Sequence, residues 1–235
     1  MKAFLLSAGL GTRLRPLTNS IPKCLVPING KPLLKWWIEL FEMHGVNEVL
    51  INLHHLPDQV IQYIKNLNPA IKFTFYFEDK LLGSAGTLRQ NKLFVKNEEN
   101  VLIAYADNLT NYNLTVFHEF HIQKNKPFSM ALFNSGTPSS CGIAVLDKED
   151  TIIEFEEKPV NPKSNLANAG IYIAKPEIFN LIPDFECTDI GFHLLPQLVN
   201  NMAGWMTKDY LIDIGTIENL RKAEQEWLLI NKEKK

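Results

Sequence analysis

The chain has 235 residues, 46% hydrophobic and 21% charged, and its formal net charge at pH 7 is −2. This composition is that of a globular protein, and it excludes a disordered chain and the strongly basic surface of a nucleic-acid-binding protein. No apolar run approaches the ~18 residues of a membrane span, and three scattered cysteines suit neither a disulfide framework nor a zinc site. We therefore expect a cytoplasmic protein with no nucleic-acid and no membrane partner.

The first half of the chain alternates predicted strands with predicted helices. Apolar runs predict strands over residues 2–7, 48–52, 71–77 and 101–105. Apolar side chains at helical spacing predict helices over residues 32–43, 57–67, 84–93 and 114–123. This alternation indicates a mainly parallel sheet covered on both faces, in which ligands bind beyond the carboxyl ends of the strands.

The second half is richer in predicted strands. These cover residues 129–133, 143–146, 152–155, 169–173 and 210–214. Predicted helices cover residues 177–181, 191–199 and 217–230, and residues 232–235 are expected to be a frayed tail. Without a linker or a repeat, one α/β domain is the simplest organisation.

A glycine-rich turn follows the first predicted strand. Gly9 and Gly11 can expose backbone N–H groups that cradle phosphate, and Arg13 lies beside them. Leu14 stands where the dinucleotide fingerprint has its third glycine, and the Gly-Lys-Ser/Thr of a P-loop is absent. Arg13 and Lys23 would suit a triphosphate. On the turn alone, however, a tight turn with surface cations is the slightly better interpretation.

Six segments, beginning with this turn, resemble in order the motifs of the sugar-1-phosphate nucleotidyltransferases. They are residues 9–18 continued by 22–33, then 82–87, 106–107, 155–159, 168–170 and 213–216. The resemblance implies the family's fold, a Rossmann-like α/β arrangement with a mixed, mainly parallel sheet flanked by helices. It also implies one domain over residues 1–235, with a nucleotide-binding half of about 1–125 and a sugar-phosphate-binding half of about 126–235.

The reaction implied by the resemblance joins a nucleoside triphosphate (NTP) and a sugar 1-phosphate into a nucleotide sugar and releases pyrophosphate. A phosphate oxygen of the sugar attacks the α-phosphorus in line, so alignment and charge neutralisation dominate the catalysis. Mg²⁺ is the implied cofactor, because it suits carboxylate and phosphate oxygens. No general base is required, since a phosphate oxygen is already nucleophilic.

The resemblance also implies a role for each matching residue. The nucleotide would contact Ala8, Gly9, Gly11, Thr12, Arg13, Lys23, Gly83 and Gly86. The sugar phosphate would contact Gly142, Glu157, Lys158, Asn168 and Gly170. Asp107 and Asp213 would hold the metal, and Arg13, Lys23 and Asp107 would be the catalytic residues.

Each of these residues also has a purely structural interpretation. Asp107 can begin a turn, Lys158 can be an exposed cation at a strand end, and Asp213 can cap the last helix. Asn168 beside Gly170 can form a β-bulge. Taken together, these interpretations would have to coincide with the order of the motifs, so the functional one is favoured.

Two positions depart from the family pattern, and the substrates stay open. Cys24 follows Lys23 where the family often has proline, and Ala106 stands where it commonly has glycine before the metal aspartate. Neither departure removes a charged role. Residues 82–87 resemble the guanylyltransferases for mannose 1-phosphate and related heptose phosphates, and this resemblance favours GTP with one of these sugars. The alternatives are uridylyl or thymidylyl transfer to a hexose or amino-sugar 1-phosphate, and a regulatory homologue that only binds nucleotide sugar.

Three further expectations complete the sequence analysis. A dinucleotide-dependent oxidoreductase is disfavoured by Leu14. A homodimer is left open as a partner arrangement. Finally, we expect alanine at Gly11 to impair nucleotide binding more than alanine at Gly204 does.

Overall fold

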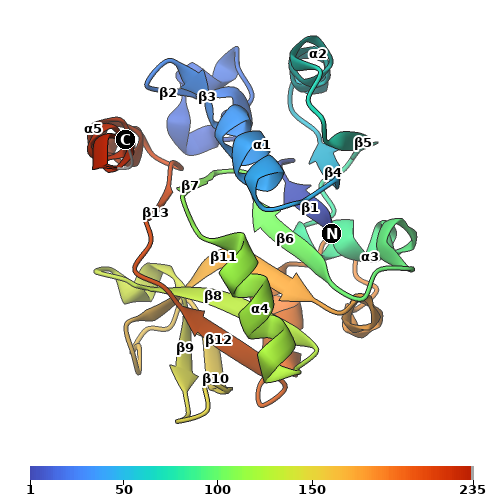
Figure 1. Cartoon of the computed structure of the whole chain (residues 1–235), viewed down its shortest axis with the longest axis vertical. Coiled ribbons are helices and arrows are strands. Elements are labelled where there is room, and N and C mark those ends of the chain that lie inside the picture. Colours follow the sequence, from blue (N-terminus) through green and yellow to red (C-terminus); the bar gives the residue numbers. More distant parts are fainter. Residues whose placement is uncertain (234–235) are drawn as a thin grey trace.

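The computed structural model describes the backbone of residues 1–233 and the side chains of residues 1–230. Its centre is a nine-stranded sheet (Figure 1). The strands are β1 (Lys2–Leu6), β4 (Glu48–Leu53), β5 (Lys72–Phe77), β6 (Val101–Tyr105), β8 (Phe128–Asn134), β9 (Gly142–Leu146), β10 (Ile152–Glu157), β11 (Leu166–Ala174) and β12 (Met202–Met206). They lie in the order β10-β9-β11-β6-β1-β4-β5, with β8 paired to β11 and β12 paired to β8.

The two halves of the chain pair their strands differently. In the first half, β1 runs parallel to both β4 and β6, and β5 runs parallel to β4. In the second half, β11 runs antiparallel to β6, β8 and β9, and β10 runs antiparallel to β9. The sheet is therefore mixed, as expected, and it is continuous across both halves because β11 pairs with β6.

Helices cover both faces of this sheet. They are α1 (Leu33–Met43), α2 (Pro57–Leu67), α3 (Ser84–Gln90), α4 (Leu114–Lys124) and α5 (Ile217–Glu233). Successive side chains of a strand point to opposite faces, and β1 follows this rule: Ala3 and Leu5 join the apolar core beneath α1, α2, α4 and α5, whereas Phe4 and Leu6 join a second core beneath α3. Burial on both faces explains why these strands have continuous apolar sequences.

Several elements differ from the sequence prediction. The helix expected over residues 84–93 ends at Gln90, and a short 3₁₀ helix over Lys92–Val95 follows it. The helix expected over residues 191–199 is one π-helical turn, Ile190–Leu194, followed by a 3₁₀ turn, Leu195–Leu198. The expectation of a frayed tail from residue 232 was wrong at its start, since α5 continues to Glu233; residues 234–235 lie outside the described part.

The strand β12 was not predicted at all. It contains Gly204, which weakens a strand in isolation, and it forms because it pairs with β8 along its whole length. A side chain at Gly204 would come within 2.5 Å of Leu146 and 2.7 Å of Leu132. Alanine at Gly204 therefore disturbs the core, which makes this residue a poor reference for a test of nucleotide binding.

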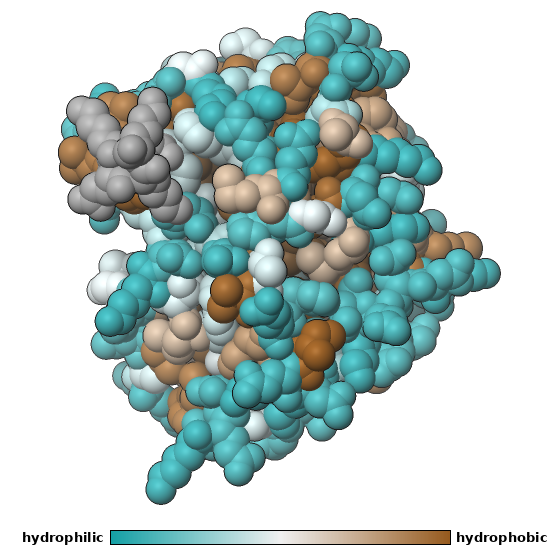
Figure 2. Space-filling model, in the orientation of Figure 1, coloured by the Kyte–Doolittle hydropathy of each residue, from teal (hydrophilic) through white to brown (hydrophobic). Residues whose placement is uncertain are grey.

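Two small antiparallel pairs lie outside the main sheet. One joins β2 (Pro27–Ile28) to β3 (Lys31–Pro32), and the other joins β7 (Asn108–Thr110) to β13 (Leu211–Asp213). Among the described residues, no helix is long and apolar enough to cross a membrane. Figure 2 shows a largely hydrophilic face on which the hydrophobic residues are scattered, as is normal for a protein surface.

Candidate active site

A cleft of about 670 Å³ opens beyond the carboxyl end of β6, and residues of both halves line it. It brings together residues that are far apart in the sequence and that the sequence analysis named as candidate site residues. These are Arg13, Asp107, Gly142, Glu157, Lys158, Asn168, Gly170 and Asp213. The position agrees with the rule that ligands of such sheets bind beyond the carboxyl ends of the strands.

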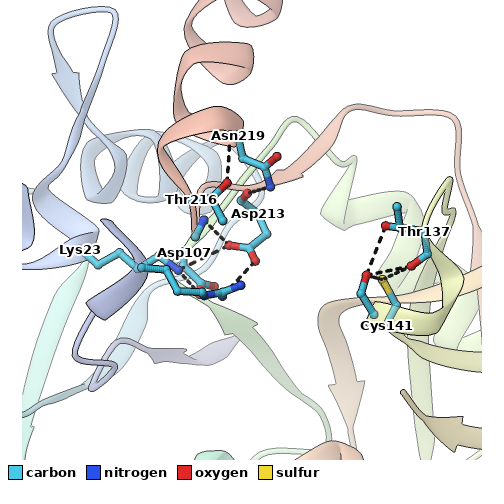
Figure 3. A network of polar contacts seen from close by, with 10 residues as sticks. Lys23, Asp107, Thr137, Cys141, Asp213, Thr216 and Asn219 are labelled. Carbon is cyan, nitrogen blue, oxygen red and sulfur yellow. Dashed lines mark hydrogen bonds and ion pairs between the residues drawn. The ribbon is translucent and has the colours of Figure 1, made fainter. Parts of the chain in front are cut away.

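Two carboxylates and two cations meet beside the cleft, and all of them except Lys23 line it. The Lys23 Nζ atom lies 2.6 Å from the nearer Asp107 carboxylate oxygen and 3.4 Å from that of Asp213. Arg13 Nη2 lies 3.8 Å from Asp213. Figure 3 shows Lys23, Asp107 and Asp213 pointing toward one another. Two carboxylates, a kind of group that suits a metal ion, therefore lie beside two cations, a kind of group that suits phosphate.

The pairing of β7 with β13 brings the two carboxylates together. Asp213 lies opposite Asn108 in this pair, and the Ile214 N–H donates to the Asp107 carbonyl oxygen at 3.0 Å. Asp107 lies two residues after the end of β6, whereas Asp213 ends β13, shortly before α5. The pKa of Asp213 is raised by burial and by the neighbouring Asp107 charge, while Lys23 opposes the shift.

The donor set fits a divalent cation that arrives with a nucleotide. Within the described residues, no group of three or more His, Cys, Asp or Glu side chains could hold a metal by itself. Mg²⁺ in nucleotide enzymes is commonly bound by one or two carboxylates, with substrate phosphates and water completing the coordination. Asp107 and Asp213 can therefore hold Mg²⁺ only together with such further oxygen ligands.

Arg13 connects the glycine turn to the carboxylate pair through its ion pair with Asp213. Gly11 has a φ of +61°, a left-handed conformation that favours glycine, and its carbonyl oxygen accepts a 2.7 Å hydrogen bond from the Thr18 hydroxyl. Thr12 begins a short 3₁₀ helix, Thr12–Leu14, that directs Arg13 to the cleft. Gly9 and Thr12 are exposed, Gly11 is half-buried and Ala8 is buried, so most of the turn is accessible to solvent.

Residues 82–87, which comprise Leu82, Gly83 and the first turn of α3 and which we call the base loop, are anchored to the sheet through a buried polar cluster. The carboxylate of Glu78, 3% exposed, accepts hydrogen bonds from Asn52, from Thr87 and from the backbone N–H of Leu82. Asn52 in turn accepts a 2.6 Å bond from the Ser7 N–H at the end of β1. The base loop and the start of the glycine turn are thus fixed by one network.

Gly83 and Gly86 pack against the protein itself. A Cβ atom at Gly83, whose φ is +77°, would lie 2.2 Å from the Thr188 carbonyl oxygen, and one at Gly86 would lie 3.1 Å from the Thr188 hydroxyl. The close approach that these glycines allow is therefore made by Thr188. Neither glycine lines the cleft, and the same holds for Ala8, Gly9, Gly11, Thr12 and Lys23.

The other side of the cleft carries the residues assigned to the sugar phosphate. Glu157 fits between two glycines, because a Cβ atom at Gly142 or at Gly191 would lie 2.5 Å or 2.4 Å from its Oε2. Burial and the Asp189 charge raise the pKa of Glu157, and the adjacent Lys158 opposes the shift. A half-buried carboxylate next to an exposed lysine can accept hydrogen bonds from hydroxyls and pair with a phosphate.

Some structural interpretations of these residues hold together with their position in the cleft. The register of β11 against β8 shifts between Asn168 and Tyr172, so Asn168 and Gly170 do form an irregularity. The Asn168 side chain accepts the Gly170 N–H at 2.9 Å and donates to the Tyr172 hydroxyl at 2.8 Å. The first turn of α5 is capped by Thr216, whose hydroxyl accepts the Asn219 N–H, and not by Asp213.

Sequence reasoning missed other residues that line the cleft. Asp189 lies beside Glu157, Lys222 and Asn219 reach the cleft from α5, and Thr137 and Cys141 face the acidic pair across it (Figure 3). Asp189 had a readable signal, since an aspartate just before a predicted helix is a typical N-cap. The others had none, because nothing in the sequence says that α5 or the loop before β9 approaches this edge of the sheet.

Comparison with known proteins places this site in a family. The family model described as Nucleotidyl transferase matches residues 2–228. The chain is 32% identical over 221 residues to the UTP–glucose-1-phosphate uridylyltransferase of Synechocystis sp., covering 86% of this chain and 56% of that protein. It is also 32% identical over 228 residues to the D-glycero-alpha-D-manno-heptose 1-phosphate guanylyltransferase of Campylobacter jejuni, covering 93% of this chain and 96% of that protein.

Solved structures share the fold over almost the whole chain. HddC from Yersinia pseudotuberculosis complexed with GMP-PN has a TM-score of 0.81 at 25% identity, covering 96% of this chain and 99% of that one. A putative glucose-1-phosphate thymidylyltransferase from Bacillus anthracis has a TM-score of 0.85 at 23% identity, covering 96% and 94%. Against several curated relatives, the chain spans only 56% to 61% of their length. The chain belongs to the nucleotidyl transferase family, among the sugar-1-phosphate nucleotidyltransferases that its motifs resemble.

Proposed function

We propose that the chain transfers a nucleotidyl group from an NTP to a sugar 1-phosphate and releases pyrophosphate, with Mg²⁺ held by Asp107 and Asp213. The observation that carries this proposal is the meeting of Lys23, Arg13 and the two aspartates at one side of a cleft whose other side presents Glu157 and Lys158. Two anionic substrates that must react can be neutralised and aligned between these groups.

Different residues of the chain bind the two substrates. The glycine turn offers backbone N–H groups to the triphosphate, and Arg13, whose side chain is exposed, is free to follow the leaving pyrophosphate. Lys23 is placed to contact the phosphates around the α-phosphorus. On the opposite side, Glu157 accepts hydrogen bonds from sugar hydroxyls and Lys158 pairs with the sugar phosphate, which directs its oxygen toward the α-phosphorus.

The metal adds charge that the side chains do not supply. When bound, Mg²⁺ neutralises phosphate oxygens and helps to align them. Because Lys23 contacts one carboxylate oxygen of each aspartate, it competes with a metal for these two oxygens.

GTP with mannose 1-phosphate or a related heptose phosphate is the favoured substrate pair. The relative of C. jejuni named a heptose 1-phosphate guanylyltransferase is matched over nearly its full length, and the similar HddC structure contains GMP-PN. The uridylyltransferase relative and the thymidylyltransferase structure support UTP or dTTP as alternatives. A cytoplasmic location, the division into two functional halves and a homodimer stay predictions.

A pyrophosphate-release assay tests the proposal. The purified protein is incubated with Mg²⁺, with GTP, UTP, dTTP or ATP, and with mannose, heptose, glucose or N-acetylglucosamine 1-phosphate. We expect release with GTP and mannose or heptose 1-phosphate. Release with UTP or dTTP but not GTP would reject the guanylyl assignment and keep the reaction. Binding of nucleotide sugar without any release would instead support the regulatory homologue.

Asp107→Ala tests the metal role within the same assay. Loss of a metal ligand at the reacting phosphates should lower pyrophosphate release by about 100-fold or more. Asp58→Ala is the control, because Asp58 lies in the first turn of α2 and does not line the cleft. Circular dichroism and thermal melting show whether each variant is folded. Undiminished release by folded Asp107→Ala would refute the metal role.

A further inference from the structure

A segment outside the recognised motifs, residues 188–192, joins the base loop to the sugar side of the cleft. The buried Thr188 donates its N–H to the Leu82 carbonyl oxygen at 2.8 Å. Its own carbonyl oxygen accepts the N–H groups of Ala85 and Gly86 at 3.0 and 3.2 Å. The backbone of this segment is therefore fastened to the base loop by three hydrogen bonds, and Gly83 leaves the room for it.

Asp189 extends this connection into the cleft. One carboxylate oxygen accepts the Ser84 hydroxyl at 2.8 Å, and the other accepts the Gly191 N–H at 2.8 Å and the Phe192 N–H at 3.4 Å. The Ser84 hydroxyl also accepts the Ile190 N–H at 2.8 Å. One oxygen of the Asp189 carboxylate thus binds a residue of the base loop, and the other oxygen binds the first turn of the π-helical segment.

That first turn sets the position of the sugar-binding carboxylate. Gly191 lies so close to Glu157 that a Cβ atom on it would be 2.4 Å from Oε2. A Cβ atom on Gly142 would likewise be 2.5 Å from this oxygen. A displacement of Gly191 therefore changes the space open to Glu157. The contacts form a continuous chain from Ser84 through Asp189 and Gly191 to Glu157.

We propose that Asp189 is a positioning residue that couples nucleotide binding to sugar-phosphate binding. The proposal rests on the proposed function, because it takes the base loop and Glu157 as parts of the two substrate subsites. A nucleotide that fixes the base loop fixes Ser84, and through Asp189 it fixes the backbone against which Glu157 rests. By linkage, each substrate then binds more tightly in the presence of the other, by the same factor.

The coupling is measured as a change in affinity and not as activity. Isothermal titration calorimetry gives the dissociation constant of the sugar 1-phosphate with and without the α,β-methylene analogue of the triphosphate. This analogue cannot transfer its nucleotidyl group, because the oxygen that bridges the α- and β-phosphorus atoms, whose bond to the α-phosphorus would break, is replaced by carbon. The substrate pair is the best one in the pyrophosphate assay. We expect the analogue to tighten sugar-phosphate binding at least about fivefold in the wild type, a typical lower value for coupled sites.

Asp189→Ala should bring this factor below about twofold, which is near the absence of coupling. Asp189→Asn keeps an oxygen for the Gly191 N–H and an amide that can donate to Ser84, so it should retain at least half of the coupling free energy. The matched control is Asp147→Ala. Asp147 holds its loop in the same way, through the N–H groups of Glu149 and Thr151 at 2.9 and 2.8 Å, but it does not line the cleft. Its coupling should equal that of the wild type.

Three outcomes would overturn the inference: no coupling in the wild type, wild-type coupling in folded Asp189→Ala, or a loss as complete in Asp189→Asn as in Asp189→Ala. If Asp189→Ala does not fold, Ser84→Ala replaces it. That change removes the hydrogen bonds of the Ser84 hydroxyl with Asp189 and with the Ile190 N–H, keeps the backbone bonds of Thr188 to the base loop, and should also lower the factor below about twofold. Pyrophosphate release by the wild type is measured in parallel. Its absence would refute the proposed function, whereas its presence without coupling would refute only the role of Asp189.

Discussion

Replacement of Lys23 by methionine should have opposite effects on metal binding and on turnover. Lys23 Nζ lies 2.6 Å from Asp107 and 3.4 Å from Asp213, and only 12% of its side chain is exposed. The ammonium group is therefore the positive charge nearest to both carboxylates that we propose hold the metal. Methionine keeps most of the side-chain volume and removes the charge. The two carboxylates then carry a more negative net charge, and no ammonium group competes with a metal ion for their oxygens.

The size of the effect follows from the distances and the exposure. Two unit charges about 4 Å apart interact by about 4 kcal/mol at an effective dielectric constant near 20. The side chains of Asp107 and Asp213 are 34% and 46% exposed, so water and salt screen much of this interaction. A remainder of about 1–2 kcal/mol corresponds to an affinity for a divalent cation that is roughly 5- to 30-fold higher.

The assay is a titration of the substrate-free protein with Mn²⁺, in which electron paramagnetic resonance measures the concentration of the free ion. We expect tighter binding in Lys23→Met, together with pyrophosphate release about 100-fold slower because a cation near the reacting phosphates is lost. Lys124→Met is the control, since Lys124 forms a comparable 2.8 Å ion pair with Asp150 and does not line the cleft. Equal or weaker Mn²⁺ binding in folded Lys23→Met would refute the reasoning.

Two further predictions concern the glycine turn and a buried histidine. Gly11 and Gly45 both have left-handed backbone, at φ +61° and +70°, so alanine is strained at either position, but only Gly11 belongs to the turn beside the cleft. The affinity for nucleotide, measured by calorimetry, should therefore fall about tenfold or more in Gly11→Ala and stay unchanged in Gly45→Ala. Equal affinities in the two variants would contradict the role of the turn. His121, 1% exposed and held by Ser129 and Asn100, has its pKa lowered to about 4 by burial, so the unfolded chain takes up its proton first as pH falls below about 6.5. Its contribution to the free energy of unfolding should be full above pH 6.5 and decrease by about 2 kcal/mol by pH 5; urea unfolding of His121→Gln should show a shallower pH dependence, and an unchanged one would contradict this assignment.

The sequence predicted best where one strand and its own loop carry the information. The apolar run over residues 101–105 indicated a buried strand, and the strand-end rule placed Asp107 at the binding edge of the sheet. The glycine turn was found in the same way after β1. In both cases the local pattern of burial and the topology rule agree, and no distant contact is needed to know where the side chain lies.

Prediction failed where an element depends on a distant partner. The strand β12 contains a glycine and no alternating pattern, and only its pairing with β8 makes it a strand. The base loop shows the same dependence, because the space beside Gly83 and Gly86 is filled by Thr188, about a hundred residues later in the chain. A glycine in such a motif indicates a close approach, but the sequence does not say whether a ligand or the protein makes it.

The antiparallel pairing of β11 with β6 explains why the residues for the two substrates share one cleft. Ile171 lies opposite Ala104 and Ala174 lies opposite Val101, so the chain of β11 passes the carboxyl end of β6 at Gly170. The Asn108 side chain donates to the Ala169 carbonyl oxygen at 2.9 Å, which fixes the crossing next to Asp107. A parallel β11 would have placed Asn168 and Gly170 at the opposite edge of the sheet, away from the aspartates. The reversal of this one strand therefore brings the residues proposed to bind the sugar phosphate to the end of β6, where Asp107 follows the strand and Asp213 of β13 lies beside it.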